Sequence, residues 1–183
     1  MINAGDGIGQ HPTQALLDLY TIKKELERID NITVAMVGDL KHGRTIRSLA
    51  YLLGKYKNIK IFFVSPKTLR VGTDIKAYLH RHTINYTETE KLEPIIADID
   101  VLYQTRIQKE RFASQTAYQK CKGCYQINSA LVAQMKPTSI LMHPLPRIDE
   151  ILTEVDSSPK AVYFKQAKYG LLIRMALLHF LLR

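Results

Sequence analysis

Four short segments of the chain combine polar side chains with backbone-restricting Pro or Gly, or with several charges. They are HPTQ at residues 11–14, GDLKHGRT at 38–45, TRIQKER at 105–111 and HPLPR at 143–147. Arg44 and Arg106 are candidate carboxylate ligands, because a guanidinium fork can hold a carboxylate through two hydrogen bonds while staying charged. Two such arginines suit a dicarboxylate, although most isolated arginines are simply solvated.

His11 and Gln14 are three residues apart, which places them on one face of a helix. A His at a helix start is often only a cap or a solvent-facing residue. GDLKHGRT is also compatible with a plain strand-to-helix turn. It lacks the Gly-Lys-Ser/Thr ending of a nucleotide-binding Walker loop and does not fit the glycine spacing of a dinucleotide-binding turn.

Hydrophobic periodicity predicts the elements that position these segments. Strands are expected at 33–37, 59–64, 84–87, 101–104 and 139–142. Helices are expected at 11–28, 43–56, 73–82 and 164–182, with Thr73 or Asp74 as the cap of the third, and amphipathic stretches at 90–97, 114–121 and 129–135. This alternation predicts an α/β fold: doubly wound, with a mainly parallel sheet and helices on both faces. Three of the four polar segments then follow strands, at the sheet edge where open α/β folds bind ligands.

Composition narrows the functional classes. The chain has 183 residues, 46% of them hydrophobic, which suits one domain. Its net charge of +9 comes from well-mixed charges, which favours small anionic substrates over nucleic acid. The polar, Gly-rich start predicts no signal peptide, and no apolar run reaches membrane-spanning length. Cys121 and Cys124 have the spacing of a metal half-site or a redox pair, but the expected reading is two ordinary thiols without metal.

Taken together and in order, the four segments resemble the aspartate carbamoyltransferase family. The resemblance runs from Asn3 to the last helix and covers the second half of that family's catalytic chain. Nothing in the sequence resembles the phosphate-binding Ser-Thr-Arg-Thr segment of the first half. The related ornithine enzymes typically carry His-Cys-Leu-Pro where this chain has His-Pro-Leu-Pro, which favours aspartate as the substrate.

The resemblance implies a role for each candidate residue. His11 is the catalytic residue, hydrogen-bonded to the carbonyl oxygen of carbamoyl phosphate. The substrate-binding residues are Gln14 and the Leu145 carbonyl for the amide group, Arg44 for the α-carboxylate of aspartate, and Arg106 with Gln108 for its side-chain carboxylate. Neither Glu110 nor Arg147 is expected to touch substrate: Glu110 holds Arg106 in place, and Arg147 braces the loop at 143–147. The bond between Leu145 and Pro146 is expected to be cis.

The expected function is transfer of a carbamoyl group from carbamoyl phosphate to L-aspartate in pyrimidine biosynthesis, without metal or organic cofactor. The alternative is a non-catalytic truncated or split homologue that acts as an assembly partner. Three parts are expected: a linking segment and helix on the carbamoyl-phosphate side (1–30), the aspartate-binding α/β domain (31–163), and a C-terminal helix that packs on the missing first domain (164–183). The isolated chain is expected to be inactive, the complete protein a cytoplasmic homotrimer, and neither nucleic acid nor membrane a partner.

Overall fold

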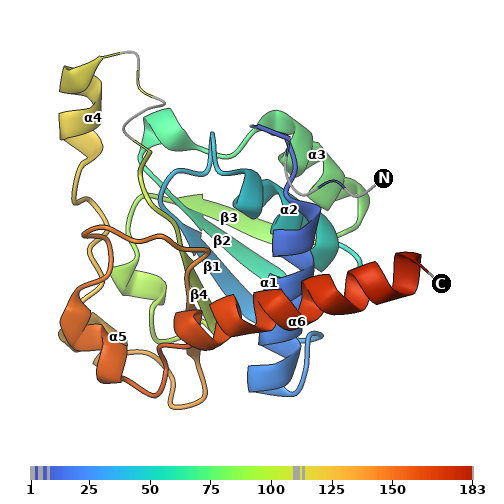
Figure 1. Cartoon of the computed structure of the whole chain (residues 1–183). Helices are drawn as coiled ribbons and strands as arrows, with labels where there is room; N and C mark the ends of the chain where they lie inside the picture. Colours follow the sequence, from blue (N-terminus) through green and yellow to red (C-terminus); the bar gives the residue numbers. More distant parts are fainter. Residues whose placement is uncertain (1–2, 4–5, 8, 109–111, 113, 183) are drawn as a thin grey trace.

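The computed structural model describes residues 3, 6–7, 9–108, 112 and 114–182. Within them, five strands form one parallel sheet in the order β3-β2-β1-β4-β5 (Figure 1). The strands are β1 (Thr33–Val37), β2 (Lys60–Val64), β3 (Asn85–Thr89), β4 (Val101–Gln104) and β5 (Ile140–Met142). The sheet is parallel throughout its four strand pairings, in agreement with the sequence prediction.

Side chains alternate along the strands and divide the core into two layers. Val34 and Met36 of β1 belong to one layer, whereas Ala35 and Val37 belong to the other. This two-residue period is the geometry of a strand whose two faces are both covered. The doubly wound architecture predicted from the sequence is therefore confirmed.

Helices cover both faces of the sheet. The first layer packs against α1 (Pro12–Leu26), α2 (Arg44–Leu53) and α3 (Thr73–Arg81). The second layer packs against the 3-10 turns η2 (Glu93–Ile95) and η4 (Thr153–Ser157), the short helix α5 (Ser129–Ala133) and the start of α6 (Tyr163–Leu181). The 3-10 turn η1 (Lys67–Leu69) and α4 (Gln115–Cys121) complete the elements, and α4 projects from the body in Figure 1.

The last helix, α6, runs across α1 (Figure 1). Lys165 Nζ and Tyr169 Oη of α6 bond to the carboxylate of Glu25 at 3.0 and 2.7 Å, and the Tyr169 ring meets Tyr20 edge to face. The C-terminal half of α6 and the residue that follows it leave large apolar side chains exposed, among them Leu171, Leu172, Met175, Leu178, Phe180, Leu181 and the C-cap Leu182. No helix among the described residues is both long and apolar enough to span a membrane.

One detail of the helix prediction was wrong. Helix α3 is capped by Gly72, and neither Thr73 nor Asp74 caps it with a side chain. Asp74 instead accepts hydrogen bonds from Arg47 and Tyr51, both on α2. The carboxylate is therefore used to join two helices, which gives it partners that the sequence pattern does not reveal.

The loops after β1 and β4 meet at the centre of the sheet. These strands are neighbours, and the chain leaves β1 toward β2 but leaves β4 toward β5, so the crossovers diverge at this point. Gly38, directly after β1, has a φ of +115°, and a Cβ there would lie 2.4 Å from the Thr105 carbonyl oxygen. Only glycine fits such a close backbone approach, and such a divergence is where doubly wound folds bind ligands.

Candidate functional site

A pocket of about 240 Å³ lies at the carboxyl edge of the sheet. It brings together residues from four segments that are far apart in the sequence. Its walls are His11, Gln14, Arg44, Thr45, Arg106, Gln108, Pro144, Leu145 and Pro146. All six residues predicted to catalyse or bind substrate therefore share one pocket, whereas their individual roles stay predictions.

His11 occupies the position just before α1, where its backbone N–H donates to Ser48 Oγ at 2.8 Å. Its ring Nδ1 is buried and has no hydrogen-bond partner among the described residues. The pKa of His11 is lowered below its usual 6.5, mainly by burial and to a smaller extent by the positive charges of Arg44 and Arg174. The imidazole is thus neutral near pH 7, and a neutral ring can donate one N–H to an acceptor in the pocket.

Gln14 is one turn further along α1 and is 7% exposed. Its Nε2 donates to Asp18 Oδ1 at 2.8 Å. Asp18 Oδ1 is the acceptor in this contact, which identifies the end of the Gln14 carboxamide that faces Asp18 as the amide nitrogen. The remaining oxygen, Oε1, is the end of the carboxamide left for a ligand.

Two arginines supply positive charge to the pocket. Arg44 is the first residue of α2, where its Nη1 donates to the Gly7 carbonyl at 3.3 Å, and Arg106 follows β4 by two residues. Both side chains are partly exposed, as is Gln108. Two guanidinium groups beside a small polar pocket suit an anion with two carboxylates.

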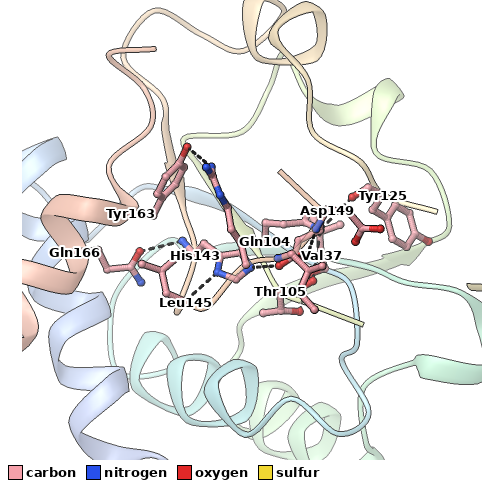
Figure 2. A network of polar contacts seen from close by, with 12 residues as sticks. Val37, Gln104, Thr105, Tyr125, His143, Leu145, Asp149, Tyr163 and Gln166 are labelled. Carbon is pink, nitrogen blue, oxygen red and sulfur yellow. Dashed lines mark hydrogen bonds and ion pairs between the residues drawn. The ribbon is translucent and has the colours of Figure 1, made fainter. Parts of the chain in front are cut away.

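The loop at 143–147 closes the pocket with Leu145. The bond between Leu145 and Pro146 is cis, as the resemblance implied, and Leu145 has a left-handed φ of 53°. His143 is 1% exposed and lies between Gln166 and Leu145 (Figure 2). Its backbone N–H donates to Gln166 Oε1 at 2.9 Å, and its ring Nδ1 accepts from the Leu145 N–H at 2.8 Å.

The second ring nitrogen of His143 fixes the tautomer. Because Nδ1 accepts a hydrogen bond, the ring proton is on Nε2, which lies 2.8 Å from Glu150 Oε1. Burial alone would raise the pKa of Glu150, but bonds from His143 and from the Ile148 N–H lower it below 4.5. Glu150 is therefore a carboxylate that locks the His143 ring, and through it the backbone of Leu145.

Comparison with known proteins places this geometry in a family. Residues 30–181 match the family model for the aspartate/ornithine carbamoyltransferase Asp/Orn binding domain. The chain belongs to this carbamoyltransferase family. It is 53% identical over its whole length to aspartate carbamoyltransferase 3, chloroplastic, of Pisum sativum, and covers 47% of that protein. It is 54% identical over 178 residues to the aspartate carbamoyltransferase catalytic subunit of Methanocaldococcus jannaschii, covering 58% of it.

Solved structures of aspartate transcarbamoylases agree with the carbamoyltransferase fold. The catalytic subunit of M. jannaschii superposes with a TM-score of 0.88 at 54% identity, over 96% of this chain and 56% of that chain. The Trypanosoma cruzi enzyme in complex with carbamoyl phosphate and aspartate gives a TM-score of 0.90 at 42% identity, over 96% and 58%. The chain thus spans about half the length of the relatives it matches.

Two residues, Arg147 and Glu110, are predicted from the sequence to support the carbamoyltransferase site without touching substrate. Arg147 binds the carboxylate of Asp156 through both terminal nitrogens, donates to Tyr163 Oη at 2.9 Å, and does not line the pocket. The bond to Asp156 raises the pKa of Arg147 further above its usual value. Glu110 lies outside the described residues, so its expected contact with Arg106 stays a prediction.

Sequence reasoning missed the buried polar groups behind the pocket of this carbamoyltransferase domain. They are Asp18, Tyr103 and Gln166, each at most 1% exposed. A signal for Asp18 existed: it lies four residues after Gln14, on the same face of the opening helix, next to apolar positions. Nothing in the local sequence marks Tyr103 or Gln166, since their importance depends on the partner they meet in space.

Cys121 is buried and Cys124 is exposed, and neither forms a disulfide. Thr68 Oγ1 lies 3.9 Å from the Cys121 sulfur. Neither cysteine lines the pocket. Their assignment as ordinary thiols without metal stays a prediction.

Proposed function

We propose that this chain is the aspartate-binding domain of an aspartate carbamoyltransferase. The reaction transfers the carbamoyl group of carbamoyl phosphate to the amine of L-aspartate and yields N-carbamoyl-L-aspartate and phosphate, a step of pyrimidine biosynthesis. The observation that carries the proposal is the single pocket in which the six candidate residues converge from four segments. The family match and the named aspartate carbamoyltransferase relatives support the same reading.

The charges in the pocket fit the reaction. The amine of aspartate attacks the carbamoyl carbon, a C–N bond forms, and negative charge builds on the carbonyl oxygen. The C–O bond to phosphate then breaks, and the departing phosphate takes up the amine proton. A neutral His11 can donate its N–H to that oxygen, and a preorganised donor of this kind is worth roughly 3 to 4 kcal/mol. His11 is therefore assigned to stabilise the developing charge.

The remaining groups orient the two substrates. Gln14 Oε1 and the Leu145 carbonyl are acceptors for the amide N–H groups of carbamoyl phosphate. Arg44 is assigned to the α-carboxylate of aspartate, and Arg106 with Gln108 to its side-chain carboxylate. Holding the amine and the carbamoyl carbon in register needs no metal or organic cofactor, because positioning can supply much of the catalysis.

Aspartate is favoured over ornithine by charge. A second guanidinium suits the side-chain carboxylate of aspartate and would repel the side-chain ammonium of ornithine. The T. cruzi structures with aspartate bound are of relatives 42 to 43% identical to this chain. The sequence identity to enzymes that bind aspartate supports aspartate as the substrate.

Phosphate binding and assembly require a complementary domain. We assign residues 1–30 to the carbamoyl-phosphate side, 31–163 to the aspartate domain, and 164–183 to a helix that packs on the complementary domain through its exposed apolar side chains. The complete protein is assigned as a homotrimer. A cytoplasmic location is retained from the sequence, although several plant relatives are named as chloroplastic proteins.

The test compares the 183-residue chain with a fusion. The fusion joins the chain to the part of the M. jannaschii catalytic subunit outside the matched segment, and product is measured as carbamoyl aspartate. We expect the chain alone to be folded by circular dichroism but inactive, and the fusion to be active with aspartate and inactive with ornithine. A folded, trimeric fusion without activity would contradict the proposal and favour the non-catalytic assembly partner.

A further inference from the structure

A fully buried carboxylate lies behind the pocket. Asp18 is 0% exposed, and donors from three elements converge on it. Its Oδ1 accepts from Gln14 Nε2 at 2.8 Å and from Gln166 Nε2 at 2.7 Å, while its Oδ2 accepts from Tyr103 Oη at 2.6 Å. The carboxylate therefore joins α1, β4 and α6 at one point.

The first consequence concerns Gln14. A carboxamide has one donor end and one acceptor end, and Asp18 binds the donor end. The acceptor end, Oε1, must then face away from Asp18, and Gln14 itself lines the pocket. Without Asp18 the carboxamide could turn by 180° and offer N–H groups where the substrate also offers N–H groups.

The second consequence concerns Leu145. Because Asp18 binds the donor end of Gln166, Gln166 Oε1 is free to accept from the His143 N–H. The His143 ring in turn accepts from the Leu145 N–H. A continuous series of hydrogen bonds thus runs from Asp18 to the backbone of Leu145, whose carbonyl is the second acceptor of the pocket.

We propose that Asp18 is a positioning residue that fixes both acceptors for the carbamoyl amide group, Gln14 Oε1 and the Leu145 carbonyl. The inference rests on the function proposed above and specifies how one substrate group is oriented. Asp18 does not line the pocket, so it acts through Gln14 and through Gln166.

The arrangement tolerates either protonation state of the carboxyl group. Burial raises the pKa of Asp18 to about 7, so both forms are populated near neutral pH. In the protonated form the proton is on Oδ2 and is donated to Tyr103 Oη, since a hydroxyl can also accept. Oδ1 continues to accept from Gln14 and Gln166, and their orientation is preserved.

Two substitutions of nearly equal shape at position 18 should differ in their effect. Asp18→Asn keeps an acceptor at Oδ1 and places an NH2 group against Tyr103, so it should preserve both glutamines. Asp18→Leu has no acceptor and removes the Oδ1 partner from the Nε2 groups of Gln14 and Gln166. Tyr103→Phe is the matched control: it removes the hydroxyl at Oδ2, together with its contacts to Thr45 and Gln14, and leaves Oδ1 in place as the acceptor of both glutamines.

The first experiment measures the side-chain amides of the 183-residue chain by ¹H–¹⁵N NMR. We expect the Gln14 and Gln166 carboxamide protons to exchange slowly with water and to show a single orientation in the unmodified chain, in Asp18→Asn and in Tyr103→Phe. A Gln14 carboxamide that averages between two orientations in the unmodified chain would overturn the proposal. This measurement does not depend on catalysis or on whether Asp18→Leu folds.

The second experiment uses the active fusion and a double-mutant cycle. Asp18→Asn should stay within about threefold of the parent in kcat/KM for carbamoyl phosphate, whereas Asp18→Leu should lose roughly tenfold or more. In a Gln14→Ala background the loss from Asp18→Leu should shrink, because part of its effect is already absent. If Asp18→Leu does not fold, Gln166→Met is used in its place. It removes the hydrogen bonds that link Asp18 to His143, leaves the bond between Asp18 and Gln14, and should lower kcat/KM.

Two outcomes of the cycle would reject the positioning role. In the first, Asp18→Leu lowers kcat/KM by the same factor in the Gln14→Ala background as in the parent. In the second, Asp18→Asn lowers kcat/KM as much as Asp18→Leu does. An inactive parent fusion would instead count against the proposed function, and the NMR result would then decide on the positioning of Gln14 by itself.

Discussion

Replacing Asp18 with Asn should change how stability depends on pH. Burial of the carboxylate, only partly offset by its hydrogen bonds with Tyr103, Gln166 and Gln14, raises the pKa of Asp18 from 3.8 to about 7 in the folded chain. The folded chain therefore binds a proton at this group at pH values where the unfolded chain has released it. Asn cannot titrate, so the substitution removes this difference while keeping the shape of the side chain.

The sign follows from the direction of the shift. A carboxyl group with a raised folded-state pKa contributes stability that is complete below about pH 4 and is lost as the pH rises through about 7. Each pH unit between the two pKa values corresponds to about 1.4 kcal/mol. Raising the pH from 5 to 8 crosses about two units of that interval, so the unmodified chain should lose about 3 kcal/mol of unfolding free energy relative to Asp18→Asn.

Urea unfolding followed by circular dichroism at pH 5, 6, 7 and 8 measures this difference for the two chains. The other ionisable groups that face Asp18, Tyr103 from β4 and Arg174 from α6, are present in both and cancel in the comparison. Curves of unfolding free energy against pH that run parallel for the two chains would refute the reasoning. So would a relative gain in stability of the unmodified chain as the pH rises.

Three further predictions concern other parts of the chain. Gly38→Ala should destabilise the fold by about 2 to 4 kcal/mol in urea unfolding, because it combines a strained φ with a backbone clash; Gly123→Ala, also at positive φ but in open space, should cost less, and equal costs would contradict the clash. Arg106→Ala in the fusion should raise the aspartate requirement and lower turnover, at least about tenfold in kcat/KM, by loss of a charge-assisted contact; unchanged aspartate dependence would remove it from the site. Elemental analysis should find no stoichiometric metal, whereas zinc lost with Cys121→Ser would show that Cys121 and Cys124 bind it.

The elements of the sheet could be predicted closely from the sequence. The strands at 33–37 and 101–104 have the expected bounds, because short β-branched and apolar runs end abruptly at polar residues or turns. The third strand, expected at 84–87, lies at Asn85–Thr89. Its side chains are only partly buried, so hydrophobicity marks its ends poorly at this edge of the sheet.

The residues of the pocket could also be predicted, because most of them follow strand or loop signals that parallel topology carries to one edge. The polar groups behind the pocket could not. Asp18 acts as a hydrogen-bond acceptor because Tyr103 and Gln166 lie next to it in the folded chain. Hydrophobic periodicity predicts which face of a helix is buried, but it does not predict which side chain of another element that face will meet. The same reason explains why Asp74 joins two helices and does not cap its own.

The bond between Asp18 and Gln166 has a consequence for the order of folding. The two residues are 148 positions apart in the chain. During synthesis, α1 leaves the ribosome long before α6. Asp18 therefore lacks one of its three hydrogen-bond donors until residue 166 has also left the ribosome. Contacts of such separation slow folding, because a long loop must close before they form. The Gln166 contact with Asp18 can therefore form only after α6 has been synthesised.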